Sequence, residues 1–333
     1  MRVALVGAGR IGASHATLLA RRVPEADLVA VADPRPGAAA AVAEPLGARA
    51  ETDVDTVLAA DDVDAVVVTA ATPAHAGLVT GAAAAGKHVF CEKPAGLSLA
   101  EIAAGRDATA RAGVVFQVGF NRRFDAGFRA ARDAVDAGRV GSVQLMRSLT
   151  RDPGSGPADP GAVPAWTIFT QTLIHDFDTL NWLNPDARAV DVTATADALV
   201  APGFRDAGHL DTAVVVVRYD NGAMAVAEAS FAAAYGYDVR AEVFGSRGMV
   251  TVGDGATSSL RLHDAAGRSA TTSRSDVELM TDAYTAELAA FAISVQHGRP
   301  AVVGGEDAWA AYAIAQACID SMTTGARAEV ARP

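Results

Sequence analysis

Short apolar runs alternate with alanine-rich segments of helical character over the first 120 residues. The runs contain almost no polar positions, which is typical of parallel strands buried on both faces of a sheet. Strands are predicted at residues 3–6, 28–32, 65–69, 88–91 and 114–118, and helices at 10–22, 38–46, 54–60, 74–85 and 99–112. Strict alternation of this kind, with right-handed crossovers, predicts a doubly wound α/β domain.

A different pattern follows Gly119. Longer segments follow one another as strands, and Asp220-Asn221-Gly222 predicts a hairpin turn between two of them. Strands are predicted at 142–150, 189–198, 213–219, 223–231 and 239–244, helices at 126–137, 168–183, 283–296 and 307–323, and a Pro- and Gly-rich loop at 152–164. We therefore expect an α/β domain over residues 1–120. Residues 121–333 should form an α+β domain with a large, mainly antiparallel open sheet.

Composition argues against some classes of partner. The 333 residues carry a formal net charge of −11, and the pI is about 5.1. Nucleic acids and anionic membranes need clustered Lys and Arg, so neither is an expected partner. No apolar stretch reads as a spanning helix, and the N-terminal run is too short for a signal peptide. The two cysteines, Cys91 and Cys318, suggest no disulfide framework, so a cytoplasmic location is expected.

A glycine-rich turn joins the first predicted strand to the first predicted helix. Its sequence, Gly7-Ala8-Gly9-Arg10-Ile11-Gly12, has the G-x-G-x-x-G spacing of dinucleotide-binding turns. One glycine permits the tight turn, the next lets the backbone approach a pyrophosphate at the helix N-terminus, and the third lets helix and strand pack closely. The predicted cofactor-binding residues here are Gly7, Gly9, Arg10, Ile11 and Gly12. The alternative is a glycine turn in a protein that binds no nucleotide.

Asp33 ends the second predicted strand. A carboxylate about 20 residues after the glycine turn accepts hydrogen bonds from both ribose hydroxyls of NAD. It would repel the 2′-phosphate of NADP, so NAD is the expected cofactor, although Arg35 is close enough in sequence to keep NADP open. The alternative for Asp33 is a helix N-cap before Pro34.

Glu92-Lys93-Pro94 follows the fifth predicted strand, at the sheet edge where doubly wound folds bind ligands. Lys93 is therefore expected at the nicotinamide end, where an ammonium polarises a carbonyl or alkoxide oxygen and shares its proton. The alternative is an ordinary surface lysine. Cys91 is interpreted as a buried small hydrophobe. The histidines and cysteines lack metal-ligand spacing, so no catalytic metal is expected.

Seven motifs are spread over nearly the whole chain. They are Val3–Gly12 with Ser14-His15, Thr72–His75, Gly86–Pro94, Gln117–Asp125, Arg151–Pro153, Ile174–Asp178 and Tyr235–Asp238. In this order and spacing they resemble the Gfo/Idh/MocA oxidoreductase family, and within it the inositol dehydrogenase branch. The resemblance implies a Rossmann domain that binds NAD, a substrate-binding and oligomerisation domain with an open sheet, and a homo-oligomer (tetramer or dimer) packed through that sheet.

The same resemblance implies roles for single residues. Lys93 and His175 would form an acid–base pair, with His175 taking the proton of a substrate hydroxyl while hydride leaves the same carbon for the nicotinamide. The alternative for a lone histidine is a structural role. Further implied cofactor-binding residues are Arg35, Thr72, Pro73, His75 and Glu92, beside Asp33 and Lys93. Predicted substrate-binding residues are Arg123, Asp152, Gln171, Asp178 and Tyr237, whose donors and acceptors suit a small polyhydroxylated cyclitol or sugar.

Gln171 departs from the family pattern, which usually has Asp four residues before the histidine, on the same face of a helix. Gln orients the imidazole without adding charge, so His175 would be a weaker base, the substrate would differ from inositol, or reduction would be favoured. Alternatively, Asp152 or Asp178 supplies the charge. Two other functions stay open: an NAD(P)H-dependent reductase of a keto-sugar, keto-cyclitol or imine, and a catalytically silent dinucleotide-binding sensor.

Overall fold

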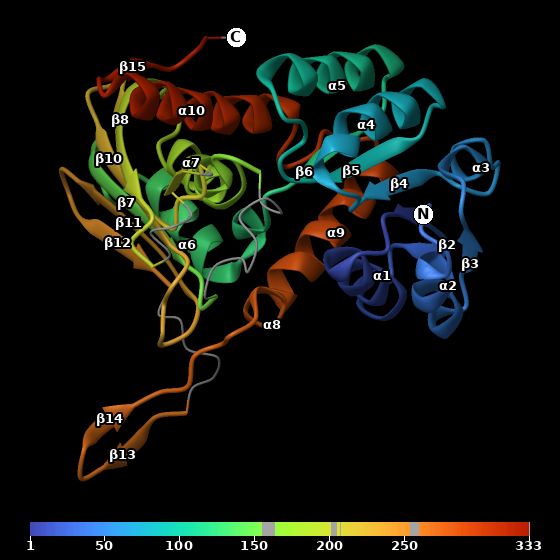
Figure 1. Cartoon of the computed structure of the whole chain (residues 1–333), viewed down its shortest axis with the longest axis horizontal. Helices are drawn as coiled ribbons and strands as arrows, with labels where there is room; N and C mark the ends of the chain where they lie inside the picture. The colour runs from blue at the N-terminus through green and yellow to red at the C-terminus, as the bar shows by residue number, and fades with distance from the viewer. Residues whose placement is uncertain (155–163, 201–204, 207, 254–259, 333) are drawn as a thin grey trace. The chain divides into compact units, whose positions relative to one another are not determined.

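The computed structural model describes residues 1–154, 164–200, 205–206, 208–253 and 260–332. They fall into two compact units (Figure 1). Unit 1 comprises Met1–Asp125 and Thr281–Trp309, and unit 2 comprises Ala126–Met280 and Ala310–Pro333. Most of the predicted loop at 152–164 lies outside the described residues. Within the described ranges, no helix is both long enough and apolar enough to cross a membrane.

Unit 1 is built on a six-stranded parallel sheet with the order β3-β2-β1-β4-β5-β6. The strands are β1 Arg2–Val6, β2 Asp27–Ala32, β3 Arg49–Glu51, β4 Ala65–Val68, β5 His88–Glu92 and β6 Phe116–Gly119. The helices are α1 Arg10–Arg22, α2 Ala38–Ala43, α3 Val54–Leu58, α4 His75–Ala84, α5 Leu99–Ala112 and α9 Thr281–Gln296, with short turns η1 Glu44–Leu46, η2 Thr72–Ala74 and η3 Asn121–Phe124. The predicted doubly wound fold is confirmed. All four residues of β4 are buried, which explains its uninterrupted apolar sequence.

Two features of unit 1 were not evident from the hydrophobic pattern. Strand β3 lies at the sheet edge and contains Arg49 and Glu51, so it carries no apolar signal. Helix α9 lies within the range predicted for the second domain, yet it packs against α1 and η3. The division of the chain at residue 120 stays a prediction about its domains.

Unit 2 is built on a seven-stranded sheet with the order β12-β11-β7-β10-β9-β8-β15. The strands are β7 Val143–Arg151, β8 Ala189–Asp197, β9 Thr212–Tyr219, β10 Met224–Ser230, β11 Asp238–Gly245, β12 Met249–Val252 and β15 Ala328–Glu329. The other elements are α6 Ala126–Asp136, a π-helical turn η5 Ile168–Thr172, α7 Ile174–Trp182, the hairpin β13 Leu262–Asp264 and β14 Gly267–Ser269, and α8 Asp276–Leu279; α10 Gly305–Thr324 begins in unit 1 and ends in unit 2. The sheet is open and mainly antiparallel, as predicted, but β7 and β10 pair in parallel.

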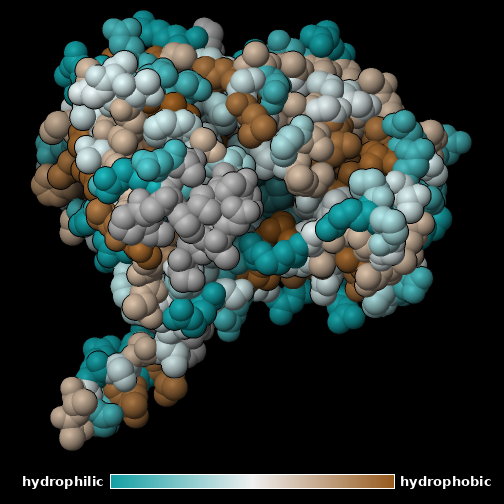
Figure 2. Space-filling view, in the orientation of Figure 1, coloured by the Kyte–Doolittle hydropathy of each residue, from teal (hydrophilic) through white to brown (hydrophobic). Residues whose placement is uncertain are grey.

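The two faces of the unit 2 sheet differ in polarity. In β9, Ala213, Val215 and Val217 are buried, and helices α6 and α7 pack against the sheet. On the other face a row of apolar side chains crosses four neighbouring strands in register, with exposed fractions between 43% and 54%: Met249, Phe244, Leu145 and Met224. Hydrophobic atoms are visible along the side of unit 2 where β10 to β12 lie (Figure 2).

Candidate active site

The glycine turn between β1 and α1 has the geometry of an anion-binding loop. Gly7 has φ +104°, and a Cβ atom there would collide with the backbone of Ala70. A Cβ atom on Gly12 would overlap the carbonyl oxygen of Gly7. Nothing lies within 4 Å of the position that a Cβ atom on Gly9 would occupy, and Gly9 is the N-cap of α1 without a side-chain cap. The backbone amides of Arg10 and Ile11 therefore begin a helix that is open to a pyrophosphate group.

Asp33 lies at the end of β2 beside this turn. Its side chain is 5% exposed, and its carboxylate accepts hydrogen bonds from the amide of Ala8 at 2.8 Å and the guanidinium of Arg35 at 2.8 and 2.9 Å. The hydrogen bonds from Arg35 lower the pKa of Asp33 to about 2. The N-cap of α2 is Gly37, so the alternative role of Asp33 as a helix cap is wrong. An ionised carboxylate at this strand end fits the ribose of NAD.

The loop after β5 holds Lys93 between two fixed neighbours. The carboxylate of Glu92 lies 2.8 Å from Nε2 of His15 and accepts a hydrogen bond from the backbone amide of Lys93 at 3.2 Å. The Lys93–Pro94 peptide bond is cis. Nδ1 of His75 lies 2.8 Å from the carbonyl oxygen of Pro94, and its Nε2 lies 2.9 Å from that of Ala70.

Most of the other residues implied in cofactor binding lie in the loops that these contacts join. His75 is buried and links the β5 loop to the loop after β4, where Thr72 and Pro73 form η2. Both ring nitrogens of His75 face backbone oxygens, so in this structure the histidine fixes loops. Contact of Thr72, Pro73, His75 or Glu92 with the cofactor stays a prediction. Cys91 is buried, as interpreted, and burial raises the pKa of its thiol well above the usual value.

Arg123 lies on η3 of unit 1 and is only 6% exposed. Its guanidinium donates to Oδ1 of Asp307 at 2.8 Å, and Oδ2 of Asp307 accepts from the amide of Gly304. The pairing places a buried cation just after β6, at the same sheet edge as the Lys93 loop. Its predicted contact with substrate stays a prediction.

In unit 2, two predicted substrate residues share one end of the sheet. Arg151 and Asp238 are partners across β7 and β11. Asp152 directly follows the first and Tyr237 directly precedes the second, so both lie at this end. Antiparallel pairing therefore brings together residues that are 85 positions apart in the sequence.

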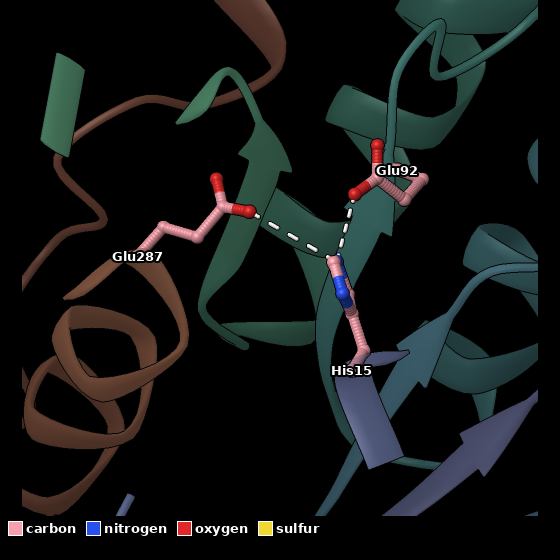
Figure 3. A group of neighbouring side chains, drawn as sticks. All are labelled: His15, Glu92 and Glu287. Atoms are coloured by element: carbon pink, nitrogen blue, oxygen red, sulfur yellow. Dashed lines mark hydrogen bonds and ion pairs between the residues drawn. The ribbon is translucent and has the colours of Figure 1, made fainter. Parts of the chain in front are cut away.

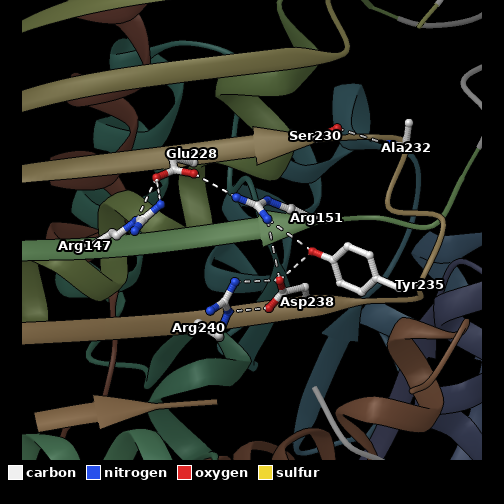
Figure 4. A network of polar contacts seen from close by, with 8 residues as sticks. All are labelled: Arg147, Arg151, Glu228, Ser230, Ala232, Tyr235, Asp238 and Arg240. Carbon is white, nitrogen blue, oxygen red and sulfur yellow. Dashed lines mark hydrogen bonds and ion pairs between the residues drawn. The ribbon is translucent and has the colours of Figure 1, made fainter. Parts of the chain in front are cut away.

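A polar network holds this end of the sheet (Figure 4). The guanidinium of Arg151 donates to Glu228 at 3.1 Å and to the hydroxyl of Tyr235 at 3.2 Å. The hydroxyl of Tyr235 donates in turn to Asp238 at 2.7 Å, and Arg240 donates to the same carboxylate. Burial disfavours the charged carboxylate of Asp238, but the hydrogen bonds from Arg240 and Tyr235 lower its pKa overall. The network connects β7, β10 and β11 and fixes the segment that carries Tyr237.

His175 lies on α7, which is attached to the inner face of this sheet. The next residue, Asp176, is fully buried and accepts hydrogen bonds from the hydroxyls of Ser148 and Thr150 on β7, at 2.5 and 2.6 Å. Sequence reasoning did not single out Asp176 for this role, because a buried structural carboxylate and a catalytic one look alike in sequence. His175 is partly exposed, and Asp178 is buried on the same helix.

The segment that carries Gln171 is not the continuous α-helix that was predicted over 168–183. The amide of Leu173 donates to the carbonyl oxygen of Ile168 at 2.8 Å, five residues back, so one π-helical turn precedes α7. The i, i+4 relation expected between Gln171 and His175 assumed regular α-helical geometry. Because of this π turn, the spacing of four residues does not by itself place Gln171 beside His175.

The geometry of the glycine turn and Asp33 in unit 1 defines a dinucleotide-binding protein, and comparison with known proteins places it among the oxidoreductases. Residues 1–120 match the model of the oxidoreductase family with an NAD-binding Rossmann fold, and residues 132–330 match that of its C-terminal alpha/beta domain. The chain belongs to the Gfo/Idh/MocA family of oxidoreductases, as the sequence motifs predicted.

Known relatives match almost the whole chain. It is 37% identical to the myo-inositol 2-dehydrogenase of Thermotoga maritima over 309 residues, 92% of each chain. It is 36% identical to the inositol 2-dehydrogenase of Rhizobium meliloti, with 97% of each chain covered. The solved scyllo-inositol dehydrogenase of Lactobacillus casei with bound NAD(H) and scyllo-inositol is similar at a TM-score of 0.95 and 29% identity, over 100% of this chain and 99% of that one.

Proposed function

We propose that this protein oxidises a secondary hydroxyl of a cyclitol or sugar to a ketone with NAD as the acceptor, and that inositol is the first substrate to test. The supporting observation is the agreement between the site and the relatives. The glycine turn and the ionised Asp33 suit NAD, and the inositol dehydrogenases named above match both units. The domains proposed are residues 1–120 for NAD and residues 121–333 for substrate and oligomer contacts.

Bound NAD would supply the hydride acceptor, and the chain would supply the proton transfers. His175 takes the proton of the substrate hydroxyl, since an imidazole exchanges protons near neutral pH. Lys93 donates a hydrogen bond to the same oxygen and stabilises negative charge that develops on it. The chain has only two lysines against 26 arginines, so a lysine in the fixed loop after β5 stands out. Unlike arginine, it can release its proton.

Substrate recognition in this proposal depends on polar groups from both parts of the chain. Asp152, Tyr237 and Asp178 offer acceptors and donors to neighbouring hydroxyls, and Arg123 adds a fixed cation. A ligand that lacked hydroxyls would leave such groups unpaired, at a cost of about 1–3 kcal/mol for each buried group. A polyol is therefore favoured over an apolar ketone.

The decisive experiment measures NADH formation with a panel of inositols and sugars. Lys93→Met and Lys93→Arg should each lower kcat/KM by about 10³-fold, because Met donates no hydrogen bond to the reacting oxygen, and the larger, planar guanidinium of Arg neither fits the position of the ammonium nor exchanges a proton with that oxygen. The control is Lys87→Met, since Nζ of Lys87 donates to the carbonyl oxygens of Ala60 and Val63 in a loop at the other end of β5. Unchanged turnover in both Lys93 variants would refute the role of Lys93. No oxidation of any polyol would refute the proposed function.

Gln171 favours a second candidate, a reductase of a keto-sugar, keto-cyclitol or imine. A neutral residue at this position adds no negative charge of its own to stabilise a protonated His175, which favours a weaker base. NADH consumption with inosose or keto-sugar substrates, in the absence of measurable polyol oxidation, would favour the reductase.

A homo-oligomer is also part of the proposal, with the exposed face of the unit 2 sheet as the contact between copies. The row of Met249, Phe244, Leu145 and Met224 supports it. Leu145→Glu should shift sedimentation toward the monomer, because burying an unpaired carboxylate in a contact is costly. Leu199→Glu, at an exposed position outside this row, is the control. An unchanged oligomer in Leu145→Glu would exclude this face. The proposed location is the cytoplasm, where the two buried free thiols would stay reduced.

A further inference from the structure

Three titratable side chains meet inside unit 1 (Figure 3). His15 comes from α1, Glu92 from the end of β5, and Glu287 from α9. Nε2 of His15 lies 2.8 Å from Oε1 of Glu92 and 3.9 Å from Oε1 of Glu287. The side chains of His15 and Glu287 are fully buried, and that of Glu92 is 12% exposed. Neither His15 nor Glu287 has a role in the proposed reaction.

Glu287 is in a costly position for a charged group. Neither oxygen of its carboxyl group has a hydrogen-bond partner among the described residues. A buried carboxylate without hydrogen bonds is strongly disfavoured, and the simplest relief is to bind a proton. Burial, followed by the negative charge of Glu92, raises the pKa of Glu287 well above its usual value.

Glu92 is in the opposite state. Burial alone would favour its neutral form, but the hydrogen bond from His15 and the charges of His15, Lys93 and His75 lower its pKa overall. The pKa values of the two carboxyl groups around His15 therefore shift in opposite directions. Glu287 favours the neutral acid, and Glu92 favours the carboxylate. Besides those groups, the aromatic ring of Tyr284 faces these three side chains, and its centre lies 5.2 Å from that of the His15 ring.

A metal ion fits this geometry less well than a proton. Two ligand atoms that each lie about 2.0–2.1 Å from a tetrahedral zinc ion are about 3.3–3.4 Å apart. The 2.8 Å between His15 and Glu92 is a direct hydrogen bond. One proton between Nε2 of His15 and Oε1 of Glu92 satisfies both of these atoms without any ion.

We propose that Glu287 is kept as a neutral carboxylic acid beside the hydrogen-bonded pair of His15 and Glu92, and that this pair positions Lys93 through Glu92. The positioning step rests on the proposed function, and the protonation of Glu287 does not. Oε2 of Glu92 accepts the backbone N–H of Lys93. The carboxylate fits there because Gly119 faces it, since a Cβ atom on that residue would lie 3.0 Å from Oε2.

The protonation is tested by thermal unfolding between about pH 5 and pH 9. A raised pKa in the folded state stabilises the fold at low pH, and this contribution is lost as pH rises through the folded-state pKa. Glu287→Gln mimics the neutral acid and does not titrate. Its unfolding temperature relative to the unmodified protein should therefore increase as pH rises. Glu44→Gln, which removes an exposed carboxylate from the same unit, should show no such trend.

Infrared spectroscopy gives a second measurement that needs no variant to be active. At neutral pH the protein should show the carbonyl band of a protonated carboxylic acid, and Glu287→Gln should remove it. Absence of that band in the unmodified protein, or a Glu287→Gln protein that cannot fold, would overturn the proposal. So would one tightly bound divalent metal ion per chain by elemental analysis.

The positioning of Lys93 by Glu92 is tested separately, by the pH profile of kcat/KM. Glu92→Gln removes the negative charge beside Lys93, so the alkaline limb of the kcat/KM profile should move to lower pH by about one unit. An unmoved limb would overturn the positioning role. A protein that shows the acid band but oxidises no polyol would instead remove only the proposed function and the step that rests on it.

Discussion

Unit 1 and unit 2 hold their proposed functional residues in different ways. In unit 1 the glycine turn, Asp33 and Lys93 each follow a parallel strand, so all lie at the carboxyl edge of one sheet. In unit 2 Asp152, His175 and Tyr237 come from a strand end, a helix and the start of another strand. A parallel sheet makes its ligand edge predictable from strand order alone, whereas a mixed sheet does not.

The difference implies that the cofactor side depends on backbone geometry and the substrate side on individual side chains. Glycines without side chains shape the turn after β1. Around His175, by contrast, the position of α7 depends on the hydrogen bonds that Asp176 accepts from two hydroxyls of β7. Changes on the two sides should therefore separate binding of NAD from turnover.

The largest expected effect belongs to the substrate side. His175→Gln should lower kcat for polyol oxidation by about 10²- to 10⁴-fold, because the proposed general base is lost, and should leave the Kd for NADH unchanged. His297→Gln changes an exposed histidine directly after α9 and is the matched control. Loss of NADH binding in His175→Gln, or full activity of this variant, would refute the claim that unit 1 governs NAD binding and unit 2 governs turnover.

A smaller effect is expected on the cofactor side. Asp33→Ser removes the carboxylate that fits the ribose hydroxyls, so NAD affinity should fall about tenfold and the preference over NADP should weaken. Fluorescence titration with both nucleotides measures this. Because the folded-state pKa of Asp33 is about 2, its contribution to stability is present above the ordinary Asp pKa and is lost only as pH falls toward that value. The NAD preference should thus be constant down to about pH 4, and a midpoint near neutral pH would contradict this assignment.

The smallest expected effect tests whether the side chain of Gln171 faces His175. Gln171→Asp places a negative charge in the π-helical turn before α7. If the carboxylate reaches His175, inositol oxidation should rise several-fold and its acidic limb should move to higher pH, since a nearby anion stabilises the imidazolium. Gln171→Asn is the neutral control. An unchanged profile in Gln171→Asp would mean that the π turn directs this side chain away from the imidazole.

Much of the fold followed from local pattern, and its failures have identifiable causes. The glycine turn, the parallel strands and the main strands of unit 2 were predicted, because buried strands and turns leave contiguous signals. β3 was missed because an edge strand with two charged residues carries no such signal. The π turn before α7 was missed because helical periodicity does not reveal a single inserted residue.

The sequence by itself determined the cofactor motif, the place of Lys93 after a buried strand and the family of the protein, since these depend on residues adjacent in the chain. Only the tertiary structure decided that β7 and β10 run in parallel, that Asp176 fixes α7, and that Glu287 reaches His15 across 272 positions. Such contacts join distant segments, and the cost of burying a charge becomes apparent only when its surroundings are known.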